Sequence, residues 1–164
     1  MLGPVELVVM AFNDEHEARK VLKSLRKLQK QQVIRLFNAA VLVKNSAGKT
    51  TLQETEDVDT KRGVLFGAIA GALIGLLGGP GGAIVGAAAG AATGGMAADR
   101  IDLGFSGEFL DELKGSLKPG SSAILAIVEH KWVDRIVEEL QRYEGKLLRH
   151  ALKDEVAEQL AKSR

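Results

Sequence analysis

Cysteine is absent from the 164-residue sequence, which excludes disulfide bonds and thiolate metal sites. Histidine is scarce, and the three imidazoles, His16, His130 and His150, stand at no metal-ligand spacing from one another. The net charge is only +1, so the overall charge does not favour nucleic acid or an acidic partner. The sequence therefore predicts no metal site, no cofactor and no nucleic-acid partner.

Nucleotide-binding and catalytic motifs are also missing. The stretch Gly48-Lys49-Thr50 looks like the end of a phosphate-binding P-loop, but that motif requires glycine where the sequence has Val43. The glycine-rich region contains no G-x-G-x-x-G that follows a strand and opens a helix. Acidic neighbours such as Asp111 and Glu112 have no nucleophile and base to act with. The sequence thus predicts a protein that is not an enzyme and has no catalytic residues.

Charged side chains are absent from residues 63–98, although charged residues flank this segment on both sides. Inside it, glycine recurs at every fourth position in two successive runs, a spacing that keeps the glycines near one face of a helix. The interruption Gly78-Gly79-Pro80-Gly81-Gly82 separates the two runs. We therefore predict a glycine-zipper helical hairpin. Its packing positions are Gly63, Gly67, Gly71, Gly75, Gly79, Gly82, Gly86, Gly90 and Gly94.

The two arms of this hairpin are short for a membrane span. Residues 64–78 and 83–98 would form helices of 15 and 16 residues. Such helices reach about 22–24 Å, whereas a hydrocarbon core is about 30 Å thick. Small residues allow helices to pack closely within lipid. We predict homo-oligomerisation through the hairpin, either in a membrane or with the hairpin buried against the sheet or between the subunits of a soluble oligomer.

Basic residues flank the predicted hairpin in the sequence: Lys61 and Arg62 precede it, and Arg100 follows it. The positive-inside tendency places such residues at the cytoplasmic side of a membrane. The membrane interpretation therefore predicts the lipid bilayer as a partner, with the α/β domain on the cytoplasmic side of the cytoplasmic membrane. The alternative is a cytoplasmic, soluble oligomer that acts as a ligand-binding or regulatory module, and for it the sequence names no small-molecule ligand.

Apolar runs at the two ends of the chain repeat one order of elements, a strand, a helix and a strand. Two such units predict an α+β fold, a ferredoxin-like split βαβ sandwich whose helices lie on one face of an antiparallel sheet. The first helix is expected to be capped by Asn13 or Asp14, and a further helix by Ser106. The expected strands are residues 5–12, 33–44, 49–53, 122–129 and 146–152, and the later helices are residues 108–117 and 131–142.

This repeat divides the chain into three parts. Residues 1–62 plus 99–152 are expected to form one discontinuous α/β domain, residues 63–98 the inserted glycine-zipper hairpin, and residues 153–164 a C-terminal helix or tail. His16 and His130 occupy equivalent places at the starts of the two repeat helices. We therefore expect the fold to bring both to the same edge of the sheet, where they either share a ligand or are simply solvated.

The helix after residue 14 divides into an apolar face and a basic face. Beside a membrane, the basic face is expected to rest on anionic headgroups, and otherwise it is a solvated face. No aromatic residues interleave with these charges, which disfavours single-stranded nucleic acid. The basic residues are Lys20, Lys23, Arg26, Lys27 and Lys30.

Three motifs, taken in their order along the chain, resemble a bacterial family. They are residues 62–67 (RGVLFG) ahead of the glycine runs, residues 104–113 (GFSGEFLDEL) and residues 118–123 (KPGSSA). Over almost its whole length the chain is similar to the predicted membrane proteins catalogued as domain of unknown function 1269. The resemblance implies a membrane protein without an assigned activity, and it adds no catalytic residue.

Overall fold

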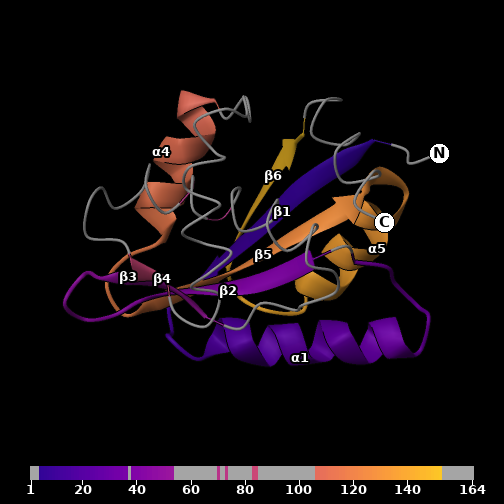
Figure 1. Ribbon diagram of the computed structural model, residues 1–164, viewed down its shortest axis with the longest axis horizontal. Coiled ribbons are helices and arrows are strands. Elements are labelled where there is room, and N and C mark those ends of the chain that lie inside the picture. Colours follow the sequence, from indigo (N-terminus) through magenta and orange to yellow (C-terminus); the bar gives the residue numbers. More distant parts are fainter. Residues whose placement is uncertain are drawn as a thin grey trace.

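A computed structural model of the protein describes residues 4–36, 38–53, 70, 73, 83–84 and 106–152. The described part is an α+β structure with helices on both faces of one six-stranded sheet (Figure 1). The strands lie in the order β4-β3-β2-β5-β1-β6. Their bounds are β1 Val5–Phe12, β2 Asn38–Lys44, β3 Thr50–Gln53, β4 Ala83–Ile84, β5 Ser121–Glu129 and β6 Lys146–Ala151.

The centre of the sheet is the antiparallel pair β1 and β5, in which Val5 lies opposite Glu129 and Phe12 opposite Ser122. Both strands are buried almost throughout, because their apolar residues alternate between two covered faces. The strands β2, β3 and β6 extend the sheet in antiparallel fashion, whereas the two-residue β4 runs parallel to β3. The predicted strands are therefore present, and β2 begins later than predicted, at Asn38.

Two helices cover one face of the sheet, α1 (Glu17–Lys30) and α5 (His130–Leu140). Figure 1 shows α1 running along this face, below the sheet in that view. Val21, Leu22 and Leu25 of α1 are fully buried against the sheet. The amphipathic pattern that predicts the helix therefore also sets which side of it packs.

The second face of the sheet is covered by α4 (Gly107–Ser116), together with Ala70 and Leu73 of the glycine-rich segment. The two helices of the predicted repeat, α1 and α5, lie on one face as predicted, whereas α4 covers the other face. Leu7 and Val9 point to this second face, and an apolar sheet face in water has to be covered. Among the described residues, α4 and the buried Ala70 and Leu73 supply that cover.

One of the two predicted helix caps is present and the other is not. Ser106 caps α4 as predicted, and its Oγ accepts a hydrogen bond of 3.0 Å from the Phe109 amide. The predicted cap of α1 is wrong, because the N-cap residue is His16 and its side chain makes no capping bond. Asp14 instead accepts a hydrogen bond of 3.1 Å from the His16 amide. The predicted C-terminal helix or tail, 153–164, lies outside the described residues.

Candidate functional site

The basic residues of α1 form one exposed surface, called here the α1 basic surface. Lys20, Lys23, Lys27 and Lys30 are exposed, and Arg26 is half-buried. Lys20 lies 4.0 Å from Glu17. In the described part of the chain, the other three lysines have no ion-pair partner. Their positive charges are therefore available to an anionic partner.

The helix that carries this surface is hydrogen-bonded to β5 at its start and to Tyr143 further along. The buried Ser122 of β5 donates a hydrogen bond of 2.5 Å to the Asp14 carbonyl oxygen and accepts one of 3.1 Å from the Ala18 amide. Ser122 thereby performs the capping role that no local side chain performs. Further along α1, the Tyr143 hydroxyl donates a hydrogen bond of 2.9 Å to Ser24. These hydrogen bonds fix the position of the α1 basic surface relative to the sheet.

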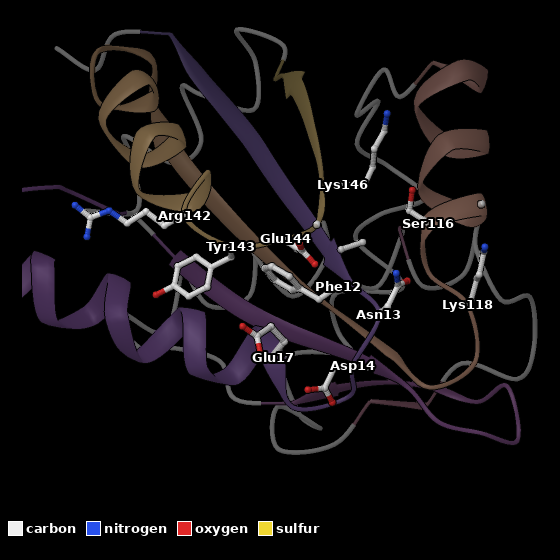
Figure 2. Close-up of a pocket in the computed structure, with 13 residues that line it drawn as sticks. Phe12, Asn13, Asp14, Glu17, Ser116, Lys118, Arg142, Tyr143, Glu144 and Lys146 are labelled. Atoms are coloured by element: carbon white, nitrogen blue, oxygen red, sulfur yellow. The ribbon is translucent and has the colours of Figure 1, made fainter.

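A cavity of about 790 Å³ opens at the end of the sheet where β1 ends and β6 begins. It lies between the start of α1, the end of α4 and the loop from α5 to β6 (Figure 2). Its polar and charged lining residues are Asn13, Asp14, Glu17, Ser116, Lys118, Arg142, Tyr143, Glu144 and Lys146. The sequence does not predict this cavity, because its walls come from three distant segments of the chain.

Gly145 forms part of the cavity wall, in very close contact with β1. A Cβ atom at this position would lie 2.5 Å from the Ala11 carbonyl oxygen and 2.9 Å from Cδ1 of Phe12. Only glycine therefore lets the loop before β6 approach β1 so closely. The shape of the cavity depends on this approach.

A second polar cluster lies at the opposite end of β1, around Glu6. The Glu6 side chain is only 9% exposed. Arg149 holds it with two hydrogen bonds of 3.0 Å, one from Nε to Oε1 and one from Nη2 to Oε2. Nδ1 of His130 lies 2.5 Å from Oε2. Burial acts to raise the pKa of Glu6, but the hydrogen bonds and positive charge of Arg149 and His130 outweigh it and lower this pKa.

We expect Glu6→Gln to reduce the free energy of unfolding at neutral pH by about 1.5–3 kcal/mol, because it removes charged hydrogen bonds. The lowered pKa of Glu6 means that its contribution is present above the ordinary glutamate pKa and is lost as the pH falls through the folded value. Urea unfolding at neutral pH and at about pH 3 measures both effects. The difference between Glu6→Gln and the unaltered protein is expected to shrink at the lower pH.

The matched control for this prediction is Glu138→Gln, which removes an exposed carboxylate from α5. We expect it to change the free energy of unfolding by less than about 0.5 kcal/mol. An equal loss in both variants, or a Glu6→Gln effect that does not depend on pH, would contradict a stabilising role for the ionised Glu6.

The expectation that His16 and His130 lie at the same edge of the sheet is wrong. His16 follows the end of β1, and His130 follows the end of β5. Because these strands are antiparallel, the two histidines lie at opposite ends of the sheet. The main chain of His130 instead bonds to the carbonyl oxygen of Pro4, ahead of the start of β1. The two imidazoles therefore share no ligand site.

Ala70 and Leu73, the described helical residues of the glycine-rich segment, are fully buried in the core formed with α4. Ala83–Ile84 forms β4, so the prediction of a helix at these two residues is wrong. Thr51 of β3 pairs with Ala83, so main-chain groups of this stretch have partners in a neighbouring strand. A helix at these residues would lose that pairing. All nine predicted packing glycines and the basic residues Lys61, Arg62 and Arg100 lie outside the described residues.

The described part of the chain contains neither a membrane-spanning helix nor a metal-binding cluster. None of the helices described there is both long enough and apolar enough to cross a membrane. Among the same residues, no group of three or more acidic and histidine side chains is placed to hold a metal ion. The α1 basic surface, the cavity and the Glu6 cluster are candidate functional positions among the described residues.

Comparison with known proteins gives one result. Searches of curated proteins and of solved structures gave no match. A family model with the description "Protein of unknown function (DUF1269)" matches residues 64–163. This range contains the glycine-rich segment and the elements from α4 to β6, whereas β1, α1, β2 and β3 precede it. The match covers more than half of the sequence, and the chain belongs to this family of proteins of unknown function.

Proposed function

We propose that the protein is a non-enzymatic, self-assembling module that associates with anionic membranes through the α1 basic surface. The observation that carries this proposal is the set of exposed lysines on α1. Residues 17–30 contain six basic residues and one acidic residue, and the buried side of the helix is fixed on the sheet. Exposed positive charge along a helix whose apolar side packs on the sheet is complementary to the negative surface of a lipid bilayer.

The expected strength of this association follows from the charge. Each lysine or arginine near an anionic surface contributes about 1 kcal/mol. The four exposed lysines, Lys20, Lys23, Lys27 and Lys30, therefore contribute about 4 kcal/mol at low salt, a weak and reversible attraction. Salt screens exposed charges beyond about 10 Å at 0.1 M, so the association is expected to weaken as salt is added.

The glycine-rich segment has a different proposed role from the α1 basic surface, namely self-assembly. The frame is a ferredoxin-like split βαβ sandwich, a view supported by the strand order β2-β5-β1-β6 and by the antiparallel pairing of these strands. The glycine-zipper hairpin is inserted into this frame and mediates helix packing and homo-oligomerisation. The burial of Ala70 and Leu73 supports packing of this segment against protein rather than lipid.

The place of action that fits this arrangement is the cytoplasmic side of the cytoplasmic membrane, with Lys61, Arg62 and Arg100 at the base of the hairpin. A soluble cytoplasmic oligomer with a buried hairpin is the second candidate, and the core position of Ala70 and Leu73 favours it. Light scattering on the purified protein tests the assembly that both candidates require. A mass equal to one chain would contradict them both.

The test of membrane association uses sedimentation with vesicles of phosphatidylglycerol and phosphatidylcholine. We expect the double variant Lys23→Glu, Lys27→Glu to bind the anionic vesicles about 30-fold or more weakly, because at least 2 kcal/mol of attraction is removed. The double variant Lys49→Glu, Lys114→Glu makes the same charge change at exposed positions outside α1. It is expected to retain most of the binding, and an equal loss in both variants would overturn the proposed role of α1.

A further inference from the structure

The cavity at the end of β1 has the dimensions of a small-molecule site. Its volume of about 790 Å³ lies within the range of about 300–1,000 Å³ that is usual for ligand pockets. Its apolar floor includes Ala11 and Phe12, which are 4% and 2% exposed, so the hollow reaches the core of the sheet. Gly145 shapes one wall through its close contact with β1.

Charges of both signs face this cavity from different elements. Figure 2 shows Lys118 and Lys146 towards α4, Asp14 and Glu17 at the start of α1, and Glu144 between these groups. In the described structure, no acidic lining residue forms an ion pair with a basic lining residue. The acidic and basic lining groups therefore do not pair directly with each other, although Glu17, Arg142 and Lys146 each have a partner outside the cavity.

Three of the charged lining residues have either no ion-pair partner or only a weak one, so a ligand could bind to them. Lys118 and Glu144 have no ion-pair partner in the described part of the chain. Lys146 reaches Glu112 only at 4.0 Å, and the two side chains are 58% and 43% exposed. Such a distant, exposed pair is weak and is easily replaced by a ligand. Two lysines and one glutamate are thus ready for partners of opposite charge.

The arrangement of charges selects the kind of ligand. A multiply charged anion would be repelled by Asp14, Glu17 and Glu144, and a cation without an acidic group would be repelled by Lys118 and Lys146. A molecule that carries one ammonium and one carboxylate group satisfies both sides at once and adds no net charge. Charge-assisted hydrogen bonds at each end would fix its orientation.

We propose that this cavity binds a small zwitterion, namely a free amino acid or a related amino carboxylate. Its carboxylate lies at Lys118, with Lys146 on the same side of the cavity, and its ammonium group lies at Glu144. The amide of Asn13, a lining residue at the end of β1, offers a neutral donor and acceptor between the two ends. This site is separate from the α1 basic surface, so the membrane proposal can fail while this one stands.

The test is a titration of the full chain, labelled with ¹⁵N, with the common free amino acids one at a time. We expect at least one of them to shift the amide signals of residues around the cavity, Gly145 among them. The best ligand is then compared with its N-acetyl derivative, which lacks the ammonium group, and with its amide, which lacks the carboxylate. Each is expected to bind at least about tenfold more weakly, because a charged hydrogen bond is lost.

Two pairs of variants locate the binding. Lys118→Gln and Glu144→Gln are each expected to weaken the best ligand at least about tenfold. Lys114→Gln and Glu138→Gln remove the same charges from exposed positions that do not line the cavity, and they are expected to leave binding unchanged. The proposal is overturned if no amino acid shifts the cavity signals, if either single-charge derivative binds equally well, or if the control variants weaken binding as much as the cavity variants.

Discussion

Replacing Gly145 with alanine is expected to reduce the free energy of unfolding by about 2–3 kcal/mol. The added Cβ would lie 2.5 Å from the main-chain oxygen of Ala11, 2.9 Å from Phe12 and 3.1 Å from Met10. A flexible methionine can move away, but the carbonyl oxygen of a central strand cannot move without disturbing the sheet. Either β6 or the loop before it must therefore shift. Urea unfolding of Gly145→Ala measures the loss.

Gly115 provides the matched control, because it also lines the cavity and nothing lies within 4 Å of a Cβ atom placed on it. It lies inside α4, where alanine is favoured over glycine by about 0.5–1 kcal/mol. Gly115→Ala is thus expected to stabilise the protein slightly. If Gly145→Ala is as stable as Gly115→Ala, the close contact between the loop and β1 is not present in solution.

The second large effect is expected from Leu73→Ala, which should reduce the free energy of unfolding by about 2–5 kcal/mol. Leu73 is fully buried in the core with α4 and the sheet, so its truncation leaves a cavity there. Leu73 belongs to the glycine-rich segment, for which the sequence also allows insertion into a membrane. A leucine that faces lipid would contribute little to unfolding of the protein in water.

Leu110 of α4 serves as the control, because it is only half-buried against the same core. Leu110→Ala is expected to lower the free energy of unfolding by clearly less than Leu73→Ala, in line with the smaller apolar area that it buries. Both are measured by urea unfolding without detergent. A Leu73→Ala loss below about 1 kcal/mol would contradict packing of this segment on the sheet.

Local patterns predict the elements whose determinants lie close together in the sequence. The apolar run from Val5 to Phe12 is a buried strand because side chains on both of its faces are apolar. The Ser106 cap is predicted for the same reason, since donor and acceptor are three residues apart. Such features depend on residues that are neighbours in the sequence, so the sequence alone is enough to predict them.

The failed predictions depend on partners that are distant in the sequence. The cap of α1 comes from Ser122, which is 104 residues away from Ala18. Ala83–Ile84 is a strand because β3 lies beside it, although its alanine-rich surroundings favour a helix. His16 and His130 lie at opposite ends of the sheet because β1 and β5, which precede them, are neighbouring antiparallel strands that are more than 100 residues apart in the sequence.

The candidate sites also differ in whether their residues are close together or far apart in the sequence. The α1 basic surface follows from periodicity within one helix, and its lysines are exposed as that periodicity indicates. The cavity brings together three segments, so no local motif marks it. Glu6 gives a partial signal, because a charged residue within a buried apolar strand requires a partner. The partner, Arg149, is 143 residues away and becomes known only from the sheet register.

The most direct test of membrane association is the salt dependence of binding by the unaltered protein to phosphatidylglycerol vesicles. We expect binding at low salt, little binding to neutral phosphatidylcholine vesicles, and release at about 1 M salt, where charges are screened beyond about 3 Å. That result is predicted if the α1 basic surface makes the contact while Leu73 stays in the core. Protein that remains on the vesicles at high salt, or binds neutral vesicles equally well, would contradict this account.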